Sequence, residues 1–148
     1  MPKSIAIYSH SIAPTIDGVC RRYTAILHEL VRQGYKVLLF TVESEPEDLP
    51  EKLPFVTLDS MTHISYPGKK VAYPSFHNLW LIFQGLREHN VDFVHMSNDG
   101  FSHMFAMAGL LLGVRLFVYL VLVDQSNCVT ILHSSSFVQL SVYFCCLP

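Results

Sequence analysis

The sequence has few of the features that mark the specialised classes of protein. Its net charge is −2, and its only paired basic residues are Arg21-Arg22 and Lys69-Lys70. No basic stripe exists, so a nucleic-acid partner is not expected. The four cysteines form no C-x-x-C pair, which argues against a zinc or thioredoxin-like site and favours reduced thiols in the cytosol. The apolar run from Ile5 to Tyr8 is too short for a signal peptide.

The two common nucleotide-binding motifs are also absent. A dinucleotide fold would place G-x-G-x-x-G directly after the first strand, and a Walker loop would need G-K-[ST]. The first loop, H-S-I-A-P-T-I-D-G-V, holds a single glycine, Gly18. Neither motif fits this chain.

The sequence is rich in hydrophobic residues that can form a core. Hydrophobic residues make up 51% of its 148 residues and charged residues 15%, which is typical of a single globular domain. Residues 4–9 and 35–41 are apolar strands, and between them apolar residues recur at helical spacing over 19–31. Gly34 follows as the helix stop. This β-α-β unit predicts a parallel pair of strands.

The same alternation continues to about residue 117. After an acidic loop over 43–54, we expect short strands at 55–58 and 64–66, a turn at 67–70, and a helix with Ser75 as its N-cap. On one face of that helix we place Phe76, Leu79, Trp80, Phe83 and Leu86, with Trp80 and Phe83 in the core. A strand at 91–96, a helix at 102–112 stopped by Gly113, and a strand from Val114 complete the pattern. The prediction is an α/β, Rossmann-like open parallel sheet with helices on both faces.

The character of the chain changes near residue 116. From Leu116 to Pro148 there is no lysine or arginine, and Asp124 is the only acid. We therefore divide the chain into a domain at 1–117 and a divergent apolar tail at 118–148. An alternative is a membrane-spanning segment over Phe101 to Val123, but Arg115 in its interior would cost at least ~2.5 kcal/mol on insertion. A helix, a glycine stop and a buried strand explain the same residues without that cost.

Polar residues gather where the predicted strands end. They are Ser9, His10 and Ser11 after the first strand, Thr41 and Glu43 after the second, and His95, Ser97, Asn98 and Asp99 at the later one. Because ligands of open α/β sheets bind beyond the carboxyl ends of the strands, these positions predict a functional cleft. The alternative is that loops after strands are simply polar.

The glycine at the start of the first helix predicts a phosphate site. Without a side chain, Gly18 lets a diphosphate approach the N–H groups of Gly18 and Val19 at the positive end of the helix. An ordinary turn glycine is the alternative. Asp17 beside it is suited to cap the helix or to orient an acceptor hydroxyl.

Histidines offer a weaker signal for metal binding. The spacing of His10, His95 and His103 matches no familiar zinc pattern, so we expect no metal site. His95, at the end of its strand, is better suited to hydrogen bonding within the cleft.

These segments together resemble the N-terminal domain of retaining family-4 glycosyltransferases of the GT-B fold. The carrying motifs are I-A-I-Y-S-H, P-T-I-D-G-V-C-R-R-Y, L-V-R-Q-G-Y-K-V-L-L-F-T and V-D-F-V-H-M-S-N-D-G, and they cover about residues 4–117. The nearest branch is similar to sulfoquinovosyl and mannosyl transferases that glycosylate lipids. The H-T-D segment typical of the family after the last strand is replaced here by F-V-Y-L-V-L-V-D-Q.

The resemblance implies specific roles for several residues. Gly18 and Val19 would bind the diphosphate of a nucleotide-sugar donor, which is a substrate, so no cofactor is expected. His10, Asp17, His95, Ser97 and Asn98 would line the acceptor side. Arg22 matches a position that is often basic in the sulfolipid-like branch, although a solvated surface arginine is an equal alternative.

The resemblance also implies partners that this chain does not supply. The acceptor would be a sugar or a lipid, and the donor-binding domain would come from missing residues or from a separate subunit. We therefore expect little or no activity from this chain alone, in the cytoplasm or on the cytosolic face of a membrane with peripheral contact. The alternatives are a non-catalytic acceptor- or phosphate-binding module, a subunit of a split enzyme, and a membrane-anchored fragment.

Overall fold

The chain folds into a parallel sheet covered by helices and extended by one small hairpin. The computed structural model describes residues 3–64, 68–97 and 101–119. Its elements, in chain order, are β1 (Ser4–Ser9), α1 (Gly18–Arg32), β2 (Lys36–Thr41), β3 (Phe55–Thr57), β4 (Ser60–Thr62), β5 (Lys70–Ala72), α2 (Phe76–Glu88), β6 (Phe93–Ser97), α3 (Ser102–Leu112) and β7 (Arg115–Tyr119).

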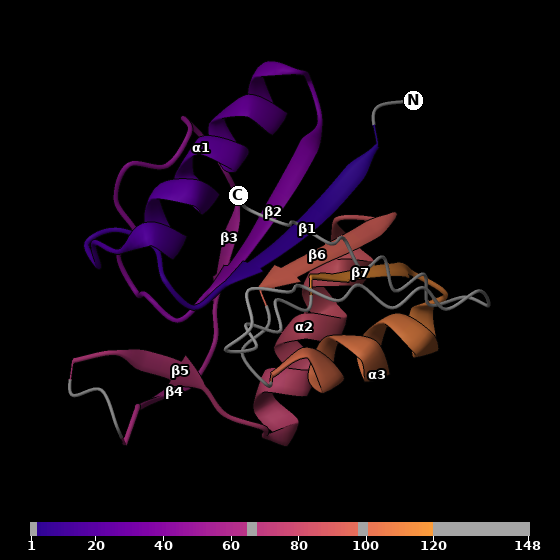
Figure 1. Ribbon diagram of the computed structural model, residues 1–148. Coiled ribbons are helices and arrows are strands. Elements are labelled where there is room, and N and C mark those ends of the chain that lie inside the picture. Colours follow the sequence, from indigo (N-terminus) through magenta and orange to yellow (C-terminus); the bar gives the residue numbers. More distant parts are fainter. Residues whose placement is uncertain (1–2, 65–67, 98–100, 120–148) are drawn as a thin grey trace, which may run out of the picture.

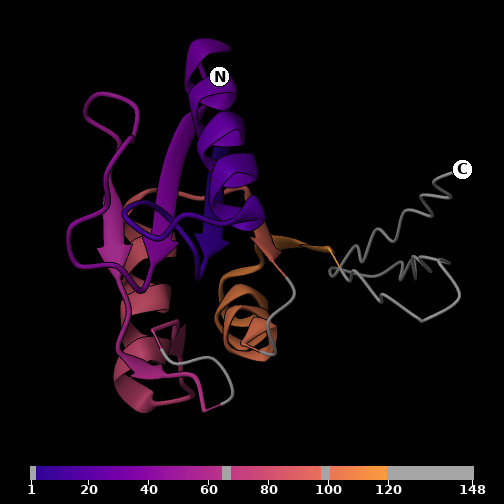
Figure 2. The same ribbon diagram turned by 60° about the vertical axis from the view of Figure 1, so that its left-hand side comes forward.

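The central sheet is parallel throughout, as the alternation of strands and helices predicts. Its five strands lie in the order β3-β2-β1-β6-β7. From β1 the chain adds β2 and β3 on one side of that strand, and it then adds β6 and β7 on the other side. Strand order therefore reverses between β1 and β6, the switch point where open α/β sheets bind ligands. Helix α1 covers one face of the sheet, and α2 and α3 cover the other (Figure 1, Figure 2).

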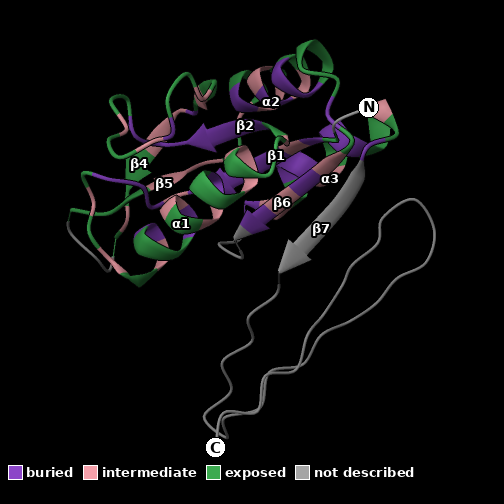
Figure 3. Ribbon diagram, turned by 90° about the horizontal axis from the view of Figure 1, so that it is seen from above, coloured by how far each residue is buried: buried purple, intermediate pink, exposed green. Residues whose placement is uncertain are grey.

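Two hydrophobic clusters lie on opposite faces of this sheet. Alternate residues of β1 and β2 point into each, so both strands are buried on both sides (Figure 3). Under α1 the buried residues are Ile7, Ile12, Tyr23, Leu27, Val37 and Leu39. Under α2 and α3 the larger cluster includes Tyr8, Phe40, Ile82, Leu86, Met96 and Phe105. Strands buried on both faces hold the carboxyl edge of the sheet rigidly in place.

Helix α1 forms as its apolar spacing predicts. Asp17 caps its N-terminus, and Gly34 follows its C-terminus with φ 82°, in the left-handed region that glycine adopts without strain. Cys20, Tyr23 and Leu27 are its buried residues. Helix α3 also has the predicted bounds, and Gly113, with φ 69°, ends it.

The buried face of α2 differs from the prediction. Trp80 is 61% exposed and Phe76 is 93% exposed, so Trp80 is not in the core. The residues that face the sheet are Asn78, Ile82, Gly85 and Leu86, while Phe83 is partly buried and stacks on Trp80. The helix is apolar on more than one side, and close contact with Phe40 selects the side that carries Gly85.

The segment before α2 also departs from the prediction. The expected strand at 64–66 is wrong at Ile64, which lies in a turn and is 89% exposed. Residues 65 and 66 lie outside the described residues. The structure instead pairs β4 with β5 in an antiparallel hairpin, so Lys70 belongs to a strand rather than to the predicted turn.

The end of the described chain is a helix followed by a strand. Strand β7 pairs in parallel with β6 and forms the edge of the sheet as far as Tyr119. Among the described residues, no helix is long and apolar enough to cross a membrane. Of the predicted tail at 118–148, residues 118 and 119 belong to β7, and the rest lies outside the described residues.

We expect Gly85→Ala to destabilise the fold. A Cβ at this position would lie 2.8 Å from Cζ of the fully buried Phe40 ring and 3.4 Å from a Leu38 methyl group. Overpacking of this kind costs about 1–3 kcal/mol, set against a gain in helix propensity of about 1 kcal/mol. Urea unfolding measures the net change in the free energy of unfolding.

The matched background is Phe40→Leu, which removes the ring that the new methyl group would meet. There the same glycine substitution should cost clearly less. Equal costs in the two backgrounds would contradict the role of the Gly85–Phe40 contact.

Candidate functional site

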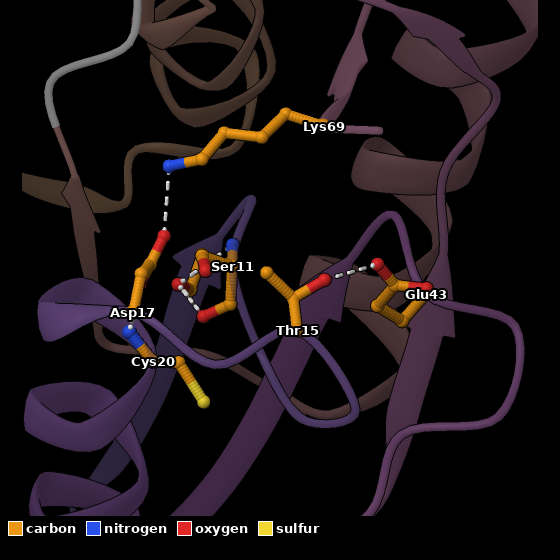
Figure 4. Close-up of polar contacts among 7 residues, drawn as sticks. Ser11, Thr15, Asp17, Cys20, Glu43 and Lys69 are labelled. Atoms are coloured by element: carbon orange, nitrogen blue, oxygen red, sulfur yellow. Dashed lines mark hydrogen bonds and ion pairs between the residues drawn. The ribbon is translucent and has the colours of Figure 1, made fainter. Parts of the chain in front are cut away.

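The carboxyl ends of β1 and β2 bring together a network of polar side chains, which we call the rim (Ser9, Ser11, Thr15, Asp17, Thr41 and Glu43). Figure 4 shows Ser11, Thr15, Asp17 and Glu43 of this set. The Ser9 hydroxyl donates to the Ser11 carbonyl at 2.9 Å and accepts from the Ser11 N–H at 3.3 Å. The Thr41 hydroxyl accepts from the Glu43 N–H at 3.2 Å. The predicted gathering of the polar residues of these two strand ends is therefore present, and most of it is buried.

Asp17 has two separate tasks at the start of α1. Its Oδ1 accepts the Cys20 N–H at 2.8 Å, which is the predicted helix cap. Its Oδ2 lies 2.9 Å from Nζ of Lys69. Partial burial acts to raise the pKa of this carboxyl, but hydrogen bonds from the Cys20 N–H and the Lys69 ammonium outweigh it and lower the pKa to about 2. Asp17 is thus ionised at neutral pH.

Gly18 is exposed at the first turn of α1, on the same edge of the sheet. A Cβ built there meets nothing within 4 Å, and its φ is outside the left-handed region. The backbone therefore does not require glycine here, and the space beside it is open. By position, the N–H groups of Gly18 and Val19 have no acceptor within the helix.

The two lysines of the hairpin belong to this edge, and sequence reasoning missed them. Lys69 pairs with Asp17, and Lys70 Nζ lies 3.1 Å from Oε2 of Glu43. The other oxygen of Glu43 accepts from the Thr15 hydroxyl at 3.2 Å. The sequence does show two adjacent lysines, but it does not indicate which acidic residues they contact.

His95 lies on the face of β6 that α1 covers. Its Nε2 is 3.3 Å from the Tyr23 hydroxyl, and the two rings are 5.7 Å apart. Burial, with a smaller effect from the Arg22 guanidinium, lowers the pKa of His95 from 6.5 to about 4. The imidazole is therefore neutral at pH 7 and is suited to hydrogen bonding rather than to carrying charge.

The remaining predicted residues are placed as follows. His10 is half-buried directly after β1, and Ser97 ends β6 at the switch point. Asn98 and Asp99 lie outside the described residues. His103 is the second residue of α3 and is exposed. In the described part of the chain, no group of three histidine, cysteine, aspartate or glutamate residues could hold a metal ion.

Two hollows lie at the opposite, amino-terminal edge of the sheet. One of about 310 Å³ lies beside Lys36, Leu53 and Pro54, and one of about 710 Å³ lies beside Asp92 and Gly113. Neither includes a residue of the rim.

We expect Asp17→Ala and Asp17→Asn to differ in stability. Loss of a capping side chain costs about 1 kcal/mol, whereas asparagine still accepts the Cys20 N–H. The alanine variant should therefore lose about 1 kcal/mol of unfolding free energy and the asparagine variant only a few tenths, as measured by urea unfolding. If both variants lost the same unfolding free energy, the effect would come from the charge of Asp17 rather than from its capping hydrogen bond.

We expect His95 to make stability depend on pH between 4 and 6.5. The unfolded chain takes up a proton on this ring near pH 6.5, whereas the folded chain does so only near pH 4. Stability is therefore lost as pH falls through this window, by on the order of 3 kcal/mol for the ring. Thermal or urea unfolding at pH 7, 5.5 and 4 should show a weaker decline for His95→Gln, and parallel curves would contradict the assignment.

Comparison with known proteins agrees with this geometry. Residues 16–120 match the family model of Glycosyltransferase Family 4. The crystal structure of MurG from Acinetobacter baumannii is similar, with a TM-score of 0.56 and 16% identity over 80% of this chain and 35% of that one. A glycosyltransferase from Rickettsia africae ESF-5 has a TM-score of 0.59 and 14% identity, over 80% of this chain and 30% of that one.

These likenesses establish the family and the fold. The chain spans about a third of the length of these solved structures. No curated protein matches its sequence significantly. The family match covers most of the chain, from the last residues of the β1–α1 loop past the end of β7. The chain belongs to glycosyltransferase family 4, and its described part has the Rossmann-like fold of the N-terminal domain of a GT-B glycosyltransferase.

Proposed function

We propose that this chain is the acceptor-side domain of a retaining glycosyltransferase. The parent reaction transfers a sugar from a nucleotide-sugar donor to an acceptor that is a sugar or a lipid. The observation that carries this proposal is the exposed start of α1, where Gly18 lies at the carboxyl edge of the sheet within the residues matched to the family.

Gly18 and Val19 hold the donor diphosphate in this proposal. Their N–H groups lie at the positive end of α1, and open space beside Gly18 lets a phosphate reach them. They would stabilise the negative charge that grows on the diphosphate as it leaves, and loss of one such donor costs on the order of 3 kcal/mol in other enzymes. The Asp17 carboxylate does not repel the ligand fully, because Lys69 compensates its charge.

The acceptor meets the residues on the other side of the same edge. His10 follows β1 and Ser97 ends β6, on either side of the switch point. We assign Asn98, which lies outside the described residues, to the same acceptor side from the family resemblance. Asp17 orients an acceptor hydroxyl, and neutral His95 contributes a hydrogen bond. Arg22 lies close enough to His95 to affect its pKa and adds positive charge on that side.

The donor-binding half is the partner that this proposal requires. The chain spans about a third of the similar solved structures, so we infer that the donor domain is supplied by further residues or by a separate subunit, and that this chain alone has little or no activity. We favour the branch of the family that transfers sulfoquinovosyl or mannosyl groups to lipids. We place the protein in the cytoplasm or, by peripheral contact, on the cytosolic face of a membrane. A second candidate is a non-catalytic phosphate- or acceptor-binding module, which the same open start of α1 supports.

Binding of inorganic pyrophosphate tests the diphosphate site. Because a Cβ at position 18 meets nothing and the backbone there is not left-handed, Gly18→Leu should fold normally. Its side chain would cover the first-turn N–H groups and weaken pyrophosphate binding at least about tenfold. A ³¹P NMR titration measures the affinity, and Gly18→Ala should have an intermediate effect.

Lys36→Met is the matched control, since it removes an exposed cation at the opposite edge of the sheet. Its affinity for pyrophosphate should equal that of the wild type. Equal binding by Gly18→Leu and the wild type would contradict the proposed site. Adding a family donor domain in trans then separates the two candidates, because sugar transfer favours the split enzyme and binding without turnover favours the module.

A further inference from the structure

Helix α2 exposes aromatic side chains on the face that points away from the sheet. Phe76 and Trp80 are both exposed, although both are large and apolar. They lie four residues apart, so their side chains are neighbours on one side of the helix. The opposite side, which carries Ile82 and Leu86, supplies the contacts with the core. Exposed aromatic residues that the core does not use mark a candidate binding surface.

The indole ring of Trp80 is supported from one side. It stacks on Phe83, with the ring centroids 6.3 Å apart and the planes inclined by 23°. Phe83 is partly buried and packs against the cluster under α2 and α3. The indole therefore rests on a ring that is anchored to the core, while most of its own surface stays open. A ring that is held in place before binding loses little conformational freedom when a ligand covers it.

A pair of polar side chains lies beside these rings. His77 precedes Trp80 by three residues, so the two side chains are neighbours on the helix. Nδ1 of His77 lies 2.7 Å from Oδ2 of Asp59. The imidazole is 62% exposed and the carboxylate 41%, so a ligand on the rings can reach both groups. Because Asp59 engages Nδ1, the other ring nitrogen of His77 is the one available to a ligand.

Buried hydrogen bonds hold Asp59 against the first turn of α2. The side chain of Asn78, fully buried, accepts the Asp59 N–H at 2.7 Å and donates to the Asp59 carbonyl at 2.9 Å. It also donates to the Tyr73 carbonyl at 2.8 Å. The Ser75 hydroxyl caps the same turn by accepting the Asn78 N–H at 3.0 Å. The position of Asp59 beside His77 is therefore fixed by the core rather than by the exposed pair alone.

We propose that this outer face of α2, which we call the platform (Asp59, Phe76, His77 and Trp80), is a carbohydrate-binding site. A pyranose presents C–H groups, which contact the electron-rich face of an aromatic ring, and hydroxyl groups, which need hydrogen-bond partners. The platform supplies exposed rings and, within one helical turn, an imidazole and a carboxylate.

Two other occupants fit this chemistry less well. A purely apolar partner would cover the Asp59–His77 pair without offering it hydrogen bonds, which costs free energy. An organic cation on the indole ring would meet a carboxylate that His77 already engages.

The platform is separate from the rim and shares no residue with it. Helix α2 leads into β6, so its first turn lies toward the carboxyl edge of the parallel sheet (Figure 1). The meaning for sugar transfer rests on the proposed function, because the platform would hold a part of a sugar acceptor that is distant from the reacting hydroxyl. Sugar binding itself requires neither the diphosphate site nor a donor domain.

Intrinsic fluorescence of the full chain tests the platform directly, because Trp80 is the only tryptophan. The probes are the methyl α-glycosides of glucose, galactose and mannose at millimolar concentrations. We expect at least one of them to change the Trp80 emission in a saturable manner. Choline chloride tests the organic cation and should leave the emission unchanged. A saturable change with choline and with none of the glycosides would overturn the proposal.

Two variants that keep Trp80 identify the groups that bind. Phe76→Ala and His77→Ala both replace exposed side chains, so both should fold normally. Each should weaken glycoside binding about fivefold, since one removes a ring contact and the other a hydrogen bond. His89→Ala is the matched control, because it removes an exposed histidine at the other end of α2. Its affinity should equal that of the wild type.

A wild-type emission that no glycoside changes would overturn the platform. Weaker binding in Phe76→Ala with wild-type affinity in His77→Ala would also overturn it, since the contact would then be merely apolar. The ³¹P titration with pyrophosphate keeps this inference apart from the proposed function. Failure of pyrophosphate binding contradicts the diphosphate site and leaves glycoside binding to be judged by fluorescence, whereas failure of glycoside binding contradicts the platform alone.

Discussion

The Asp17 carboxylate connects parts of the domain that are distant in the sequence. One oxygen accepts a backbone N–H in the first turn of α1, and the other binds the ammonium group of Lys69 on the hairpin. Because both bonds favour the ionised carboxylate, its pKa falls to about 2 despite partial burial. The start of α1 and the hairpin therefore keep a defined relation, and the edge between them is the proposed diphosphate site.

The sheet makes that arrangement rigid. Strand β1 pairs with β2 on one side and β6 on the other, and both faces of β1 and β2 are buried. Interior packing of this density allows little movement of the strand ends. The strand order reverses beside β1, and ligands of open α/β sheets bind beyond the carboxyl edge at such a point.

Charge at this edge is largely compensated within the domain. Asp17 and Glu43 each meet a lysine, and His95 is neutral at pH 7 beside Tyr23. In the proposed site, the N–H groups at the start of α1, rather than a net positive charge, attract the anion. The chain spans about a third of the similar solved structures, and two hollows lie at the opposite edge.

Local patterns in the sequence determined the β-α-β unit, the bounds of α3, and the caps at Asp17 and Ser75, because periodicity and capping act over a few residues. The buried face of α2 was not determined in this way. Trp80 fits an apolar stripe, but the close approach of Gly85 to Phe40 and the hydrogen bonds of Asn78 turn another face inward. Only the tertiary structure decided which acids the hairpin lysines meet and that Tyr23 lies on His95. Those partners are 52, 27 and 72 residues apart in the chain, and contacts over such distances depend on the packing of the whole sheet rather than on any local pattern.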